Sequence, residues 1–146
     1  MIKFKRTYDP ASRGDGRRIL VERLWPRGMK KQAVAAESWI KDVAPSTALR
    51  IWFGHREERW QEFHKRYEKE LNANPAAWAP ILEASARGTV TLLYSARDAA
   101  RNGAVVLRDY LIRRQKRRGG LRARPESTPR TPRTVAAVRR LRQRIA

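Results

Sequence analysis

Apolar and polar positions alternate in two places near the beginning of the chain. Residues 2–8 alternate well enough to predict an edge strand. Residues 18–24 predict a second strand, which we expect to end sharply at Trp25-Pro26-Arg27-Gly28, because proline has no N–H to contribute to a sheet. Between the two runs, Asp9-Pro10 and Gly14-Asp15-Gly16 predict a loop rich in turns.

Helical spacing of the apolar residues dominates the middle of the chain. A short helix is expected within residues 35–43. A second helix should begin at Pro45-Ser46-Thr47, where a hydroxyl can cap it, and end at Gly54. A third is predicted over residues 56–73, where large side chains recur on one face: Trp60, Phe63, Tyr67 and Leu71.

The remaining elements lie between residue 74 and about residue 114. Asn74-Pro75 predicts an N-cap followed by a proline in the first turn of a helix that runs to Arg87. Residues 89–95 predict a strand whose apolar residues do not alternate, as expected when both faces of a sheet are covered. A last helix should open at Asn102 or Gly103. This order of elements predicts a small layered α/β fold, with helices packed on a short, mostly parallel sheet.

The chain has five tryptophans, all within residues 25–78. Four of them occupy apolar helical positions, where core packing is expected: Trp39, Trp52, Trp60 and Trp78. Trp25 differs, because it stands at a strand end between Arg23 and Arg27. That position suits a residue that lines a pocket.

The net charge of +20 over 146 residues is divided unevenly. Residues 1–112 contain 21 lysines and arginines and 13 acids, a net charge of +8. Residues 113–146 contain 13 lysines and arginines and the single acid Glu126, a net charge of +12. We therefore expect an α/β domain, residues 1–115, followed by a basic tail rich in proline and arginine, residues 116–146.

The tail is expected to have three parts. A cationic run, residues 113–118, is followed by Gly119 and Gly120, which should break any helix. Residues 125–134 are rich in proline, serine and threonine and should be extended and mobile. The last stretch places apolar residues at helical intervals among arginines, which predicts a short basic amphipathic helix: Val135, Val138, Leu141 and Ile145.

Two interpretations of this tail remain open. It can bind nucleic acid or another polyanion by neutralising phosphates, or it can be a solvated extension without a partner. The candidate nucleic-acid contacts are Arg117, Arg118, Arg139, Arg140, Arg142 and Arg144. No aromatic residue follows Tyr110, so the tail cannot stack on bases, and its binding should be non-specific and sensitive to salt.

Composition excludes several classes of site. The chain has no cysteine, which excludes disulfides, thiolate nucleophiles and cysteine-based zinc or iron–sulfur centres. With 2 histidines, neither a His-rich metal site nor another cofactor is expected. No apolar run approaches the ~18 residues that cross a membrane, and no signal-peptide pattern opens the chain, so we expect a cytoplasmic protein.

Ligand sites of parallel α/β sheets lie beyond the carboxyl ends of the strands. Two predicted strand ends are rich in polar groups, residues 22–28 and 95–103. Arginines there would offer forked donors to a phosphate or carboxylate, and the start of the last helix would offer backbone N–H groups. The candidate ligand-binding residues are Arg23, Trp25, Arg27, Ser95, Arg97 and Asn102.

Three residues are candidates for acid–base chemistry. Glu22 and Asp98 would orient the arginines or act as a base, and His55 is a third candidate. The structural alternative makes Glu22, Asp98 and the arginines ion pairs, and His55 a surface or capping residue. The sequence therefore predicts a domain for a small anionic ligand, with or without catalysis; the alternative is a nucleic-acid-associated module acting through the tail.

Several segments, taken together in their order along the chain, carry a family resemblance. They are Arg6 to Asp9, Ile19 to Gly28, Trp39 to Ser46, Leu49 to His55, Phe63 to Leu71 and Thr91 to Asp98. Together they resemble the YeaO-like branch of domain-of-unknown-function family 488. The resemblance covers about residues 1–115 and does not include the tail.

The resemblance implies a compact bacterial α/β domain in a family named for lacking an established activity. The wider family carries a loop with cysteine and histidine after its last strand, which is suggestive of catalysis. The matching loop here, Tyr94 to Ala104, has no cysteine, and Gly103 stands where close relatives often carry histidine. Glu22 stands where they usually carry aspartate, which keeps the charge and lengthens its reach. The missing groups argue against inherited catalysis.

Overall fold

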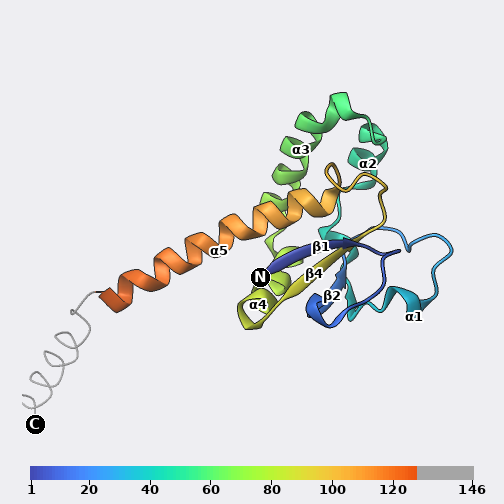
Figure 1. Cartoon of the computed structure of the whole chain (residues 1–146). Helices are drawn as coiled ribbons and strands as arrows, with labels where there is room; N and C mark the ends of the chain where they lie inside the picture. The colour runs from blue at the N-terminus through green and yellow to red at the C-terminus, as the bar shows by residue number, and fades with distance from the viewer. Residues whose placement is uncertain (128–146) are drawn as a thin grey trace, which may run out of the picture. The chain divides into compact units, whose positions relative to one another are not determined.

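A four-stranded sheet organises residues 1–112, which form one compact unit (Figure 1). The structure is a computed structural model that describes residues 1–127, with side chains through residue 118. Its strands are β1 (Ile2–Arg6), β2 (Arg17–Leu20), β3 (Ser38–Trp39) and β4 (Val90–Tyr94). They lie in the order β1-β4-β2-β3, and every neighbouring pair is parallel. The predicted α/β fold with a short parallel sheet is confirmed.

Strand β4 comes last in the sequence but lies between β1 and β2. It pairs with β1 from Ile2↔Val90 to Arg6↔Tyr94, and with β2 from Arg17↔Val90 to Leu20↔Leu93. All of its residues are buried. A central strand with both faces covered needs no polar side, which explains why this apolar run does not alternate.

The described helices connect the strands and cover the sheet. The α-helices are α1 (Lys31–Val34), α2 (Thr47–Phe53), α3 (Trp60–Ala73), α4 (Pro75–Arg87) and α5 (Gly103–Ser127). Short 3₁₀ helices are η1 (Arg13–Asp15), η2 (Lys41–Val43) and η3 (Glu57–Arg59). No helix among the described residues is both long enough and apolar enough to cross a membrane.

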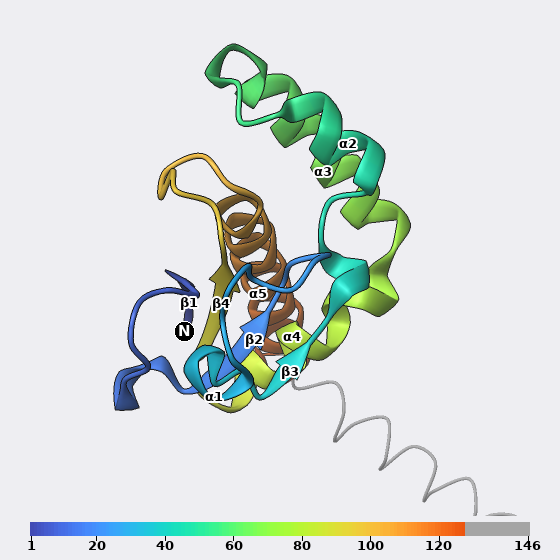
Figure 2. The ribbon, with the colours of Figure 1, turned by 90° about the vertical axis from the view of Figure 1, so that its right-hand side faces the viewer.

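Helices lie on both faces of the sheet (Figure 2). In that view α4 and α5 lie behind the strands and α1 lies in front of them. The main core joins one face to α3, α4 and the start of α5, and its fully buried members include Leu92, Tyr67, Ile81, Leu107 and Leu111. The opposite face carries a smaller cluster of Leu20, Val34 and Leu93, which α1 covers.

Tryptophan packing follows the expectation in most respects. Trp78 is buried in the main core, and Trp52 and Trp60 pack half-buried against it. Trp39 packs half-buried against the smaller cluster, but from a strand and not from a helix. Trp25 is 38% exposed and lines a cavity. It does not stand at a strand end, because β2 ends at Leu20 and is shorter than the strand predicted over residues 18–24.

Helix α2 is capped at both ends as the sequence predicts. The hydroxyl of Ser46 accepts the N–H of Leu49 at 3.1 Å, and Gly54 takes a left-handed φ of 52°. The carboxylate of Glu70 on α3 accepts the Ser46 N–H at 2.8 Å and its hydroxyl at 2.6 Å. These bonds fix the start of α2 against α3, and with it the side chains that α2 offers to the site described below.

The helix predicted within residues 35–43 is wrong. Residues 38–39 form β3, residues 41–43 form a 3₁₀ helix, and α1 lies earlier. Tertiary pairing overrides the local pattern: Glu37 donates its N–H to the carbonyl of Arg18, and Ile40 donates to Leu20, both on β2. The predicted start of α4 is correct in part. Pro75 opens that helix, but the side chain of Asn74 donates to the carbonyl of Asp42 and does not cap it.

The expected break at Gly119 and Gly120 is also wrong, because α5 continues through both to Ser127. Glycine weakens a helix by about 1 kcal/mol without forbidding helical angles. The preceding residues, 113–118, are arginine, lysine and glutamine, which favour helix. Residues 125–127, expected to be extended, belong to this helix, and the predicted stretches 128–134 and 135–145 lie outside the described residues.

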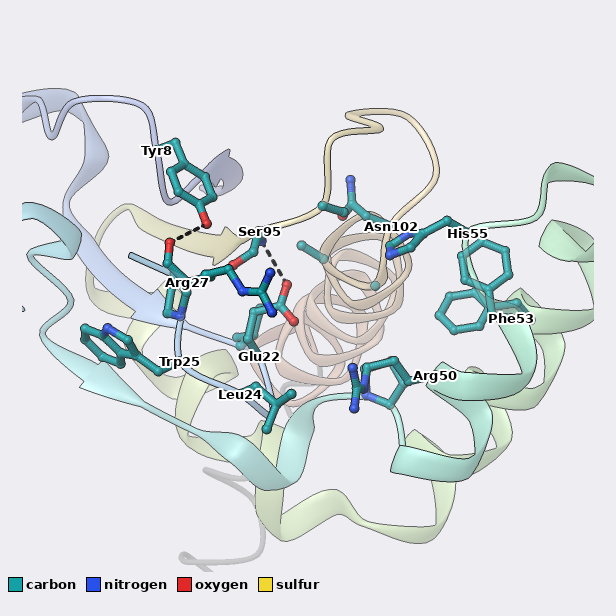
Figure 3. A pocket seen from close by; sticks show the side chains of 17 residues that line it. Tyr8, Glu22, Leu24, Trp25, Arg27, Arg50, Phe53, His55, Ser95 and Asn102 are labelled. Atoms are coloured by element: carbon teal, nitrogen blue, oxygen red, sulfur yellow. Dashed lines mark hydrogen bonds between the residues drawn. The ribbon is translucent and has the colours of Figure 1, made fainter. Parts of the chain in front are cut away.

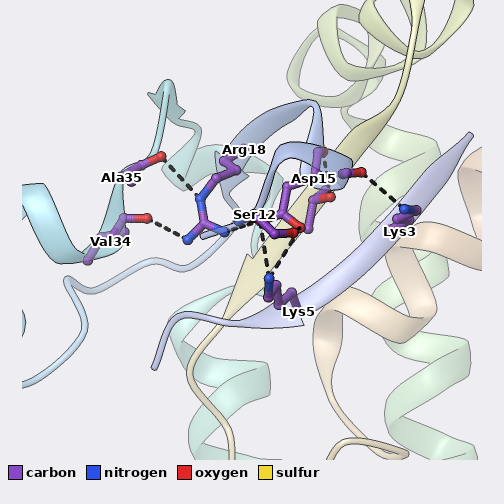
Figure 4. A network of polar contacts seen from close by, with 9 residues as sticks. Lys3, Lys5, Ser12, Asp15, Arg18, Val34 and Ala35 are labelled. Carbon is purple, nitrogen blue, oxygen red and sulfur yellow. Dashed lines mark hydrogen bonds and ion pairs between the residues drawn. The ribbon is translucent and has the colours of Figure 1, made fainter. Parts of the chain in front are cut away.

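A buried carboxylate ties β1 and β2 together on the face that α1 covers in part (Figure 4). Asp15 accepts a hydrogen bond of 2.6 Å from Arg18 on β2 and of 3.2 Å from Lys5 on β1. The backbone N–H and the hydroxyl of Ser12 each donate to it at 2.9 Å. The buried hydroxyl of Thr91 on β4 donates to the Asp15 carbonyl at 2.7 Å.

These donors stabilise the ionised form of the Asp15 carboxyl group. Burial alone would raise the pKa of Asp15, but the hydrogen bonds from Ser12, Arg18 and Lys5 outweigh it and hold the pKa well below its ordinary value. Arg18 in turn donates to the carbonyls of Val34 and Ala35 at 2.7 and 3.2 Å. The network therefore anchors α1 as well as three strands.

Asp15→Asn should lower the free energy of unfolding at neutral pH by about 3 kcal/mol, because it leaves the Arg18 guanidinium buried beside a neutral amide. A lowered folded pKa stabilises the fold above the unfolded pKa of about 4 and loses that effect as the pH falls. The variant should therefore lose less of its remaining stability on acidification. Urea unfolding at a series of pH values measures both effects. The exposed Asp9→Asn should change stability by less than about 0.5 kcal/mol; equal losses in the two variants would contradict the assignment.

Candidate functional site

A cavity of about 280 Å³ lies where the carboxyl ends of the strands meet (Figure 3). Tyr8 follows β1, Glu22 follows β2 and Ser95 follows β4, and all three line the cavity. Because the strands are parallel and β4 lies between the other two, segments far apart in the sequence come together at one edge. Helices α2 and α5 supply the opposite wall through Arg50, Phe53, Gly103 and Ala104.

Six of the predicted site residues line this cavity. They are Glu22, Trp25, Arg27, His55, Ser95 and Asn102. Arg23, Arg97 and Asp98 do not line it. Of the three arginines predicted to bind the ligand, the structure therefore brings only Arg27 into the cavity.

The three residues outside the cavity have other surroundings. Arg23 donates to the carbonyls of Pro45 and Ala44, both at 3.1 Å, and so holds the segment before α2. The Asp98 carboxylate accepts the N–H groups of Ala100 and Arg101 at 2.9 and 3.1 Å, which lower its pKa. The structural alternative therefore fits Asp98, and Arg97 is exposed.

Glu22 lies at the base of the cavity and links two strand ends. Its Oε1 accepts the N–H of Ser95 at 2.9 Å, and its carbonyl accepts the indole N–H of Trp39 on β3. Burial raises the pKa of Glu22, while the Ser95 hydrogen bond and the charge of Arg50 oppose that shift. Glu22 is thus a partly buried acid that faces a cation across the cavity.

Two arginines give the cavity its positive charge. Arg27, which follows β2, lines the cavity with an exposed side chain (Figure 3). Arg50 lines the cavity from α2 and was not among the predicted site residues. No other residue in the described part of the chain takes a hydrogen bond or an ion pair from either guanidinium. The sequence signal for Arg50 was its place in the segment Leu49 to His55, which the family resemblance includes.

The start of α5 forms another part of the wall. The Asn102 side chain accepts the N–H of Val105 at 3.1 Å and donates to the carbonyl of Asp98 at 2.9 Å, so it caps the helix. The N–H groups at Gly103 and Ala104 have no partner within the helix. A Cβ on Gly103 would lie 3.3 Å from the Pro45 ring, so glycine lets this proline pack over the helix start.

His55 reaches the cavity from an unusual backbone position. It follows Gly54 with a left-handed φ of 58°, one of two such non-glycine residues in the described chain. Its ring packs against Phe53 at a centroid distance of 6.0 Å, and Figure 3 shows it beside Asn102. A left-handed histidine carries steric strain that glycine would not. Strain of this kind is found often at functional sites.

Large exposed side chains surround the cavity mouth. Tyr8, Leu24 and Trp25 are 43%, 59% and 38% exposed. The Tyr8 hydroxyl donates to the carbonyl of Arg27 at 3.0 Å, and the Trp25 indole donates to the carbonyl of Met29 at 2.8 Å. Both rings are therefore held in place. Among the described residues, no group of three or more histidine and acidic side chains could hold a metal ion.

Comparison with known proteins identifies relatives over most of the chain. The family model described as the inactive DUF488-N3 subclade matches residues 1–131. The chain is 42% identical over 110 residues to the uncharacterised protein YeaO of Escherichia coli (strain K12), a match covering 75% of this chain and 96% of YeaO. It is 40% identical over 110 residues to the uncharacterised protein Rv3073c of Mycobacterium tuberculosis (strain ATCC 25618 / H37Rv), covering 75% and 92% of the two chains. No solved structure gives a significant match.

Replacing His55 should separate its backbone strain from its ring contact. His55→Gly and His55→Ala both remove the ring, but only glycine relieves the left-handed backbone, so the glycine variant should be the more stable by about 1 kcal/mol. Arg56 supplies the control, because its φ of −86° gives glycine no advantage. There the order should reverse, with Arg56→Ala more stable than Arg56→Gly. Thermal and urea unfolding of the four variants measure the two differences; an alanine variant at position 55 as stable as the glycine variant would show that no strain is stored there.

Proposed function

Since this chain belongs to the DUF488 family, among its YeaO-like members, we propose that its strand-end cavity binds a small anionic ligand, a phosphate or a carboxylate. The matching subclade is described as inactive, and the chain has no cysteine that could act as a nucleophile. Both points favour binding over catalysis.

The observation that carries the proposal is the pair of arginines, Arg27 and Arg50, on one cavity with neither engaged by another described residue. A guanidinium offers a fork of donors that matches the oxygens of phosphate and carboxylate. The N–H groups of Gly103 and Ala104 and the ring of His55 on the same cavity would add further donors. Two cations and a helix start around one acid favour a ligand with negative charge.

The size of the cavity limits the ligand. A volume of about 280 Å³ is just below the range of roughly 300–1,000 Å³ typical of small-molecule sites. The cavity therefore suits a ligand of metabolite size and not a polymer. The anionic group is expected on the side of Arg50 and α5, because Glu22 would repel it at the base.

The Arg27→Ala, Arg50→Ala double variant should lose at least about tenfold in affinity for an anion, because each charged hydrogen bond contributes about 1.5 kcal/mol or more. The probes are inorganic phosphate and succinate, followed by NMR through the backbone amides of Gly103 and Ala104. The double variant Arg56→Ala, Arg97→Ala has the same net charge but changes two exposed residues outside the cavity. It should bind as the unmodified chain does. Equal affinity in both double variants would show that the anion is held elsewhere.

The second candidate function, polyanion binding by the tail, is favoured by the +12 net charge of residues 113–146. Of its candidate contacts, Arg117 and Arg118 lie in α5, and Arg139, Arg140, Arg142 and Arg144 lie outside the described residues. Replacing all six by glutamine should weaken binding to duplex DNA and reduce the slope of log affinity against log salt, since each phosphate contact contributes a slope of about −0.9. Fluorescence anisotropy at several salt concentrations measures both. An unchanged slope would exclude these arginines as the contacts.

A further inference from the structure

We propose that the ligand of the strand-end cavity is amphoteric: beside its anionic group it carries an amino or ammonium group, which donates to Glu22, and a ring, which packs at the mouth. This inference rests on the proposed function and deepens it, because it assigns the opposite end of the same ligand. Two kinds of metabolite share this chemistry, aromatic amino acids and mononucleotides with an exocyclic amine.

The first observation is an open acceptor on Glu22. Its Oε1 accepts the N–H of Ser95, but no described residue donates to Oε2. In the described chain no buried side-chain oxygen or nitrogen lacks a partner, so Oε2 must be accessible. Because Glu22 lines the cavity, that oxygen faces the space where the ligand would lie. It is an acceptor that a ligand N–H can use.

The second observation concerns the charge around this oxygen. Burial raises the pKa of Glu22, the direction expected of a carboxylate with too few donors. A ligand with only negative groups would bring a like charge toward this acid and would repel it. A ligand amine would supply the missing donor and hold Glu22 ionised, while Arg27 and Arg50 take the anionic group. One molecule that carries both groups would therefore provide partners for Glu22 and for the two arginines.

The contrast with Asp15 supports this interpretation. Asp15 is a buried acid that lies just before β2, as Glu22 lies just after it. Both carboxylate oxygens of Asp15 accept hydrogen bonds, from three side chains and a backbone N–H. The fold therefore can surround a buried carboxylate completely with its own groups. At Glu22 it leaves one oxygen to the cavity.

The third observation is the mouth of the cavity. Among the described residues, five large apolar side chains are exposed, and three of them, Tyr8, Leu24 and Trp25, line the mouth. Trp25 is further held by an edge contact with Trp39 at a centroid distance of 5.4 Å. Rings that are fixed before binding lose little entropy when a flat ligand packs on them. This is why we include a ring in the ligand.

The test compares matched ligands that differ in one amine. Phenylalanine and 3-phenylpropionate differ by the α-amino group, and AMP and purine riboside 5′-monophosphate differ by the exocyclic amine. The full chain is titrated with each, and the Ser95 amide and the Trp25 indole are followed by NMR. In one pair, the amine-bearing member should bind about tenfold tighter, the effect of one charge-assisted hydrogen bond. The pair that shows this preference identifies the kind of metabolite.

Glu22→Gln should reduce that preference to about threefold or less, because the amide keeps an acceptor for Ser95 but carries no charge. The affinity for the amine-lacking partner should stay equal or rise, since a like charge has been removed. Glu83→Gln is the matched control, because this exposed glutamate on α4 lies outside the cavity. It should leave the preference unchanged.

The outcomes separate the two proposals. If both members of each pair bind equally, the amphoteric ligand is wrong while anion binding at the cavity stands. The same holds if the amine-lacking members bind tighter, which would indicate a protonated Glu22 acting as a donor. A preference that survives Glu22→Gln would assign the amine to another residue and overturn the role of Glu22. If inorganic phosphate or succinate binds and neither pair does, only the amphoteric ligand is wrong. If none of these molecules binds, both proposals fail.

Discussion

The insertion of β4 between β1 and β2 is the constraint on which the rest of the structure depends. Parallel pairing on both sides of β4 brings three strand ends to one edge, although the end of β4 comes more than seventy residues after the ends of β1 and β2 in the sequence. This position also requires that both faces of β4 be covered. Helix α1 covers one face, and α4 and α5 cover the other. The cavity lies at this edge, where residues 95–102 lead from the end of β4 to the start of α5.

Asp15 and Glu22 lie near the two ends of β2 and show how the same chemistry serves different purposes. Hydrogen bonds from Ser12, Arg18 and Lys5 overcome burial and lower the pKa of Asp15. At Glu22 burial prevails, and the pKa rises. A fully surrounded carboxylate joins strands and stabilises the fold. An incompletely surrounded one at a cavity is the arrangement expected of a site that completes its hydrogen bonds with a ligand.

Local signals in the sequence predicted most elements, and long-range pairing explains the errors. Ser46 and Gly54 marked the ends of α2 because caps are made by neighbouring residues. Residues 35–43 were misassigned because β3 exists only through its pairing with β2. For the site, the sequence correctly predicted that Glu22 and Ser95 lie together, because they follow parallel strands whose ends meet at one edge of the sheet. Arg23 and Asp98 were not, because nearby carbonyl and N–H groups occupy their side chains, and Arg50 was missed because it comes from a helix.

The charged groups of the cavity argue that it was kept for binding. A domain with only a structural role would gain from pairing its partly buried charges, as this chain does for Asp15 with Arg18. Arg27 and Arg50 instead share a cavity with an incompletely bonded glutamate and with His55 in a strained backbone position. The incompletely bonded Glu22 and the left-handed backbone of His55 cost stability in the empty protein, whereas Arg27 and Arg50 are exposed to solvent. Their coincidence at one strand-end edge is the arrangement that the proposed ligand site requires.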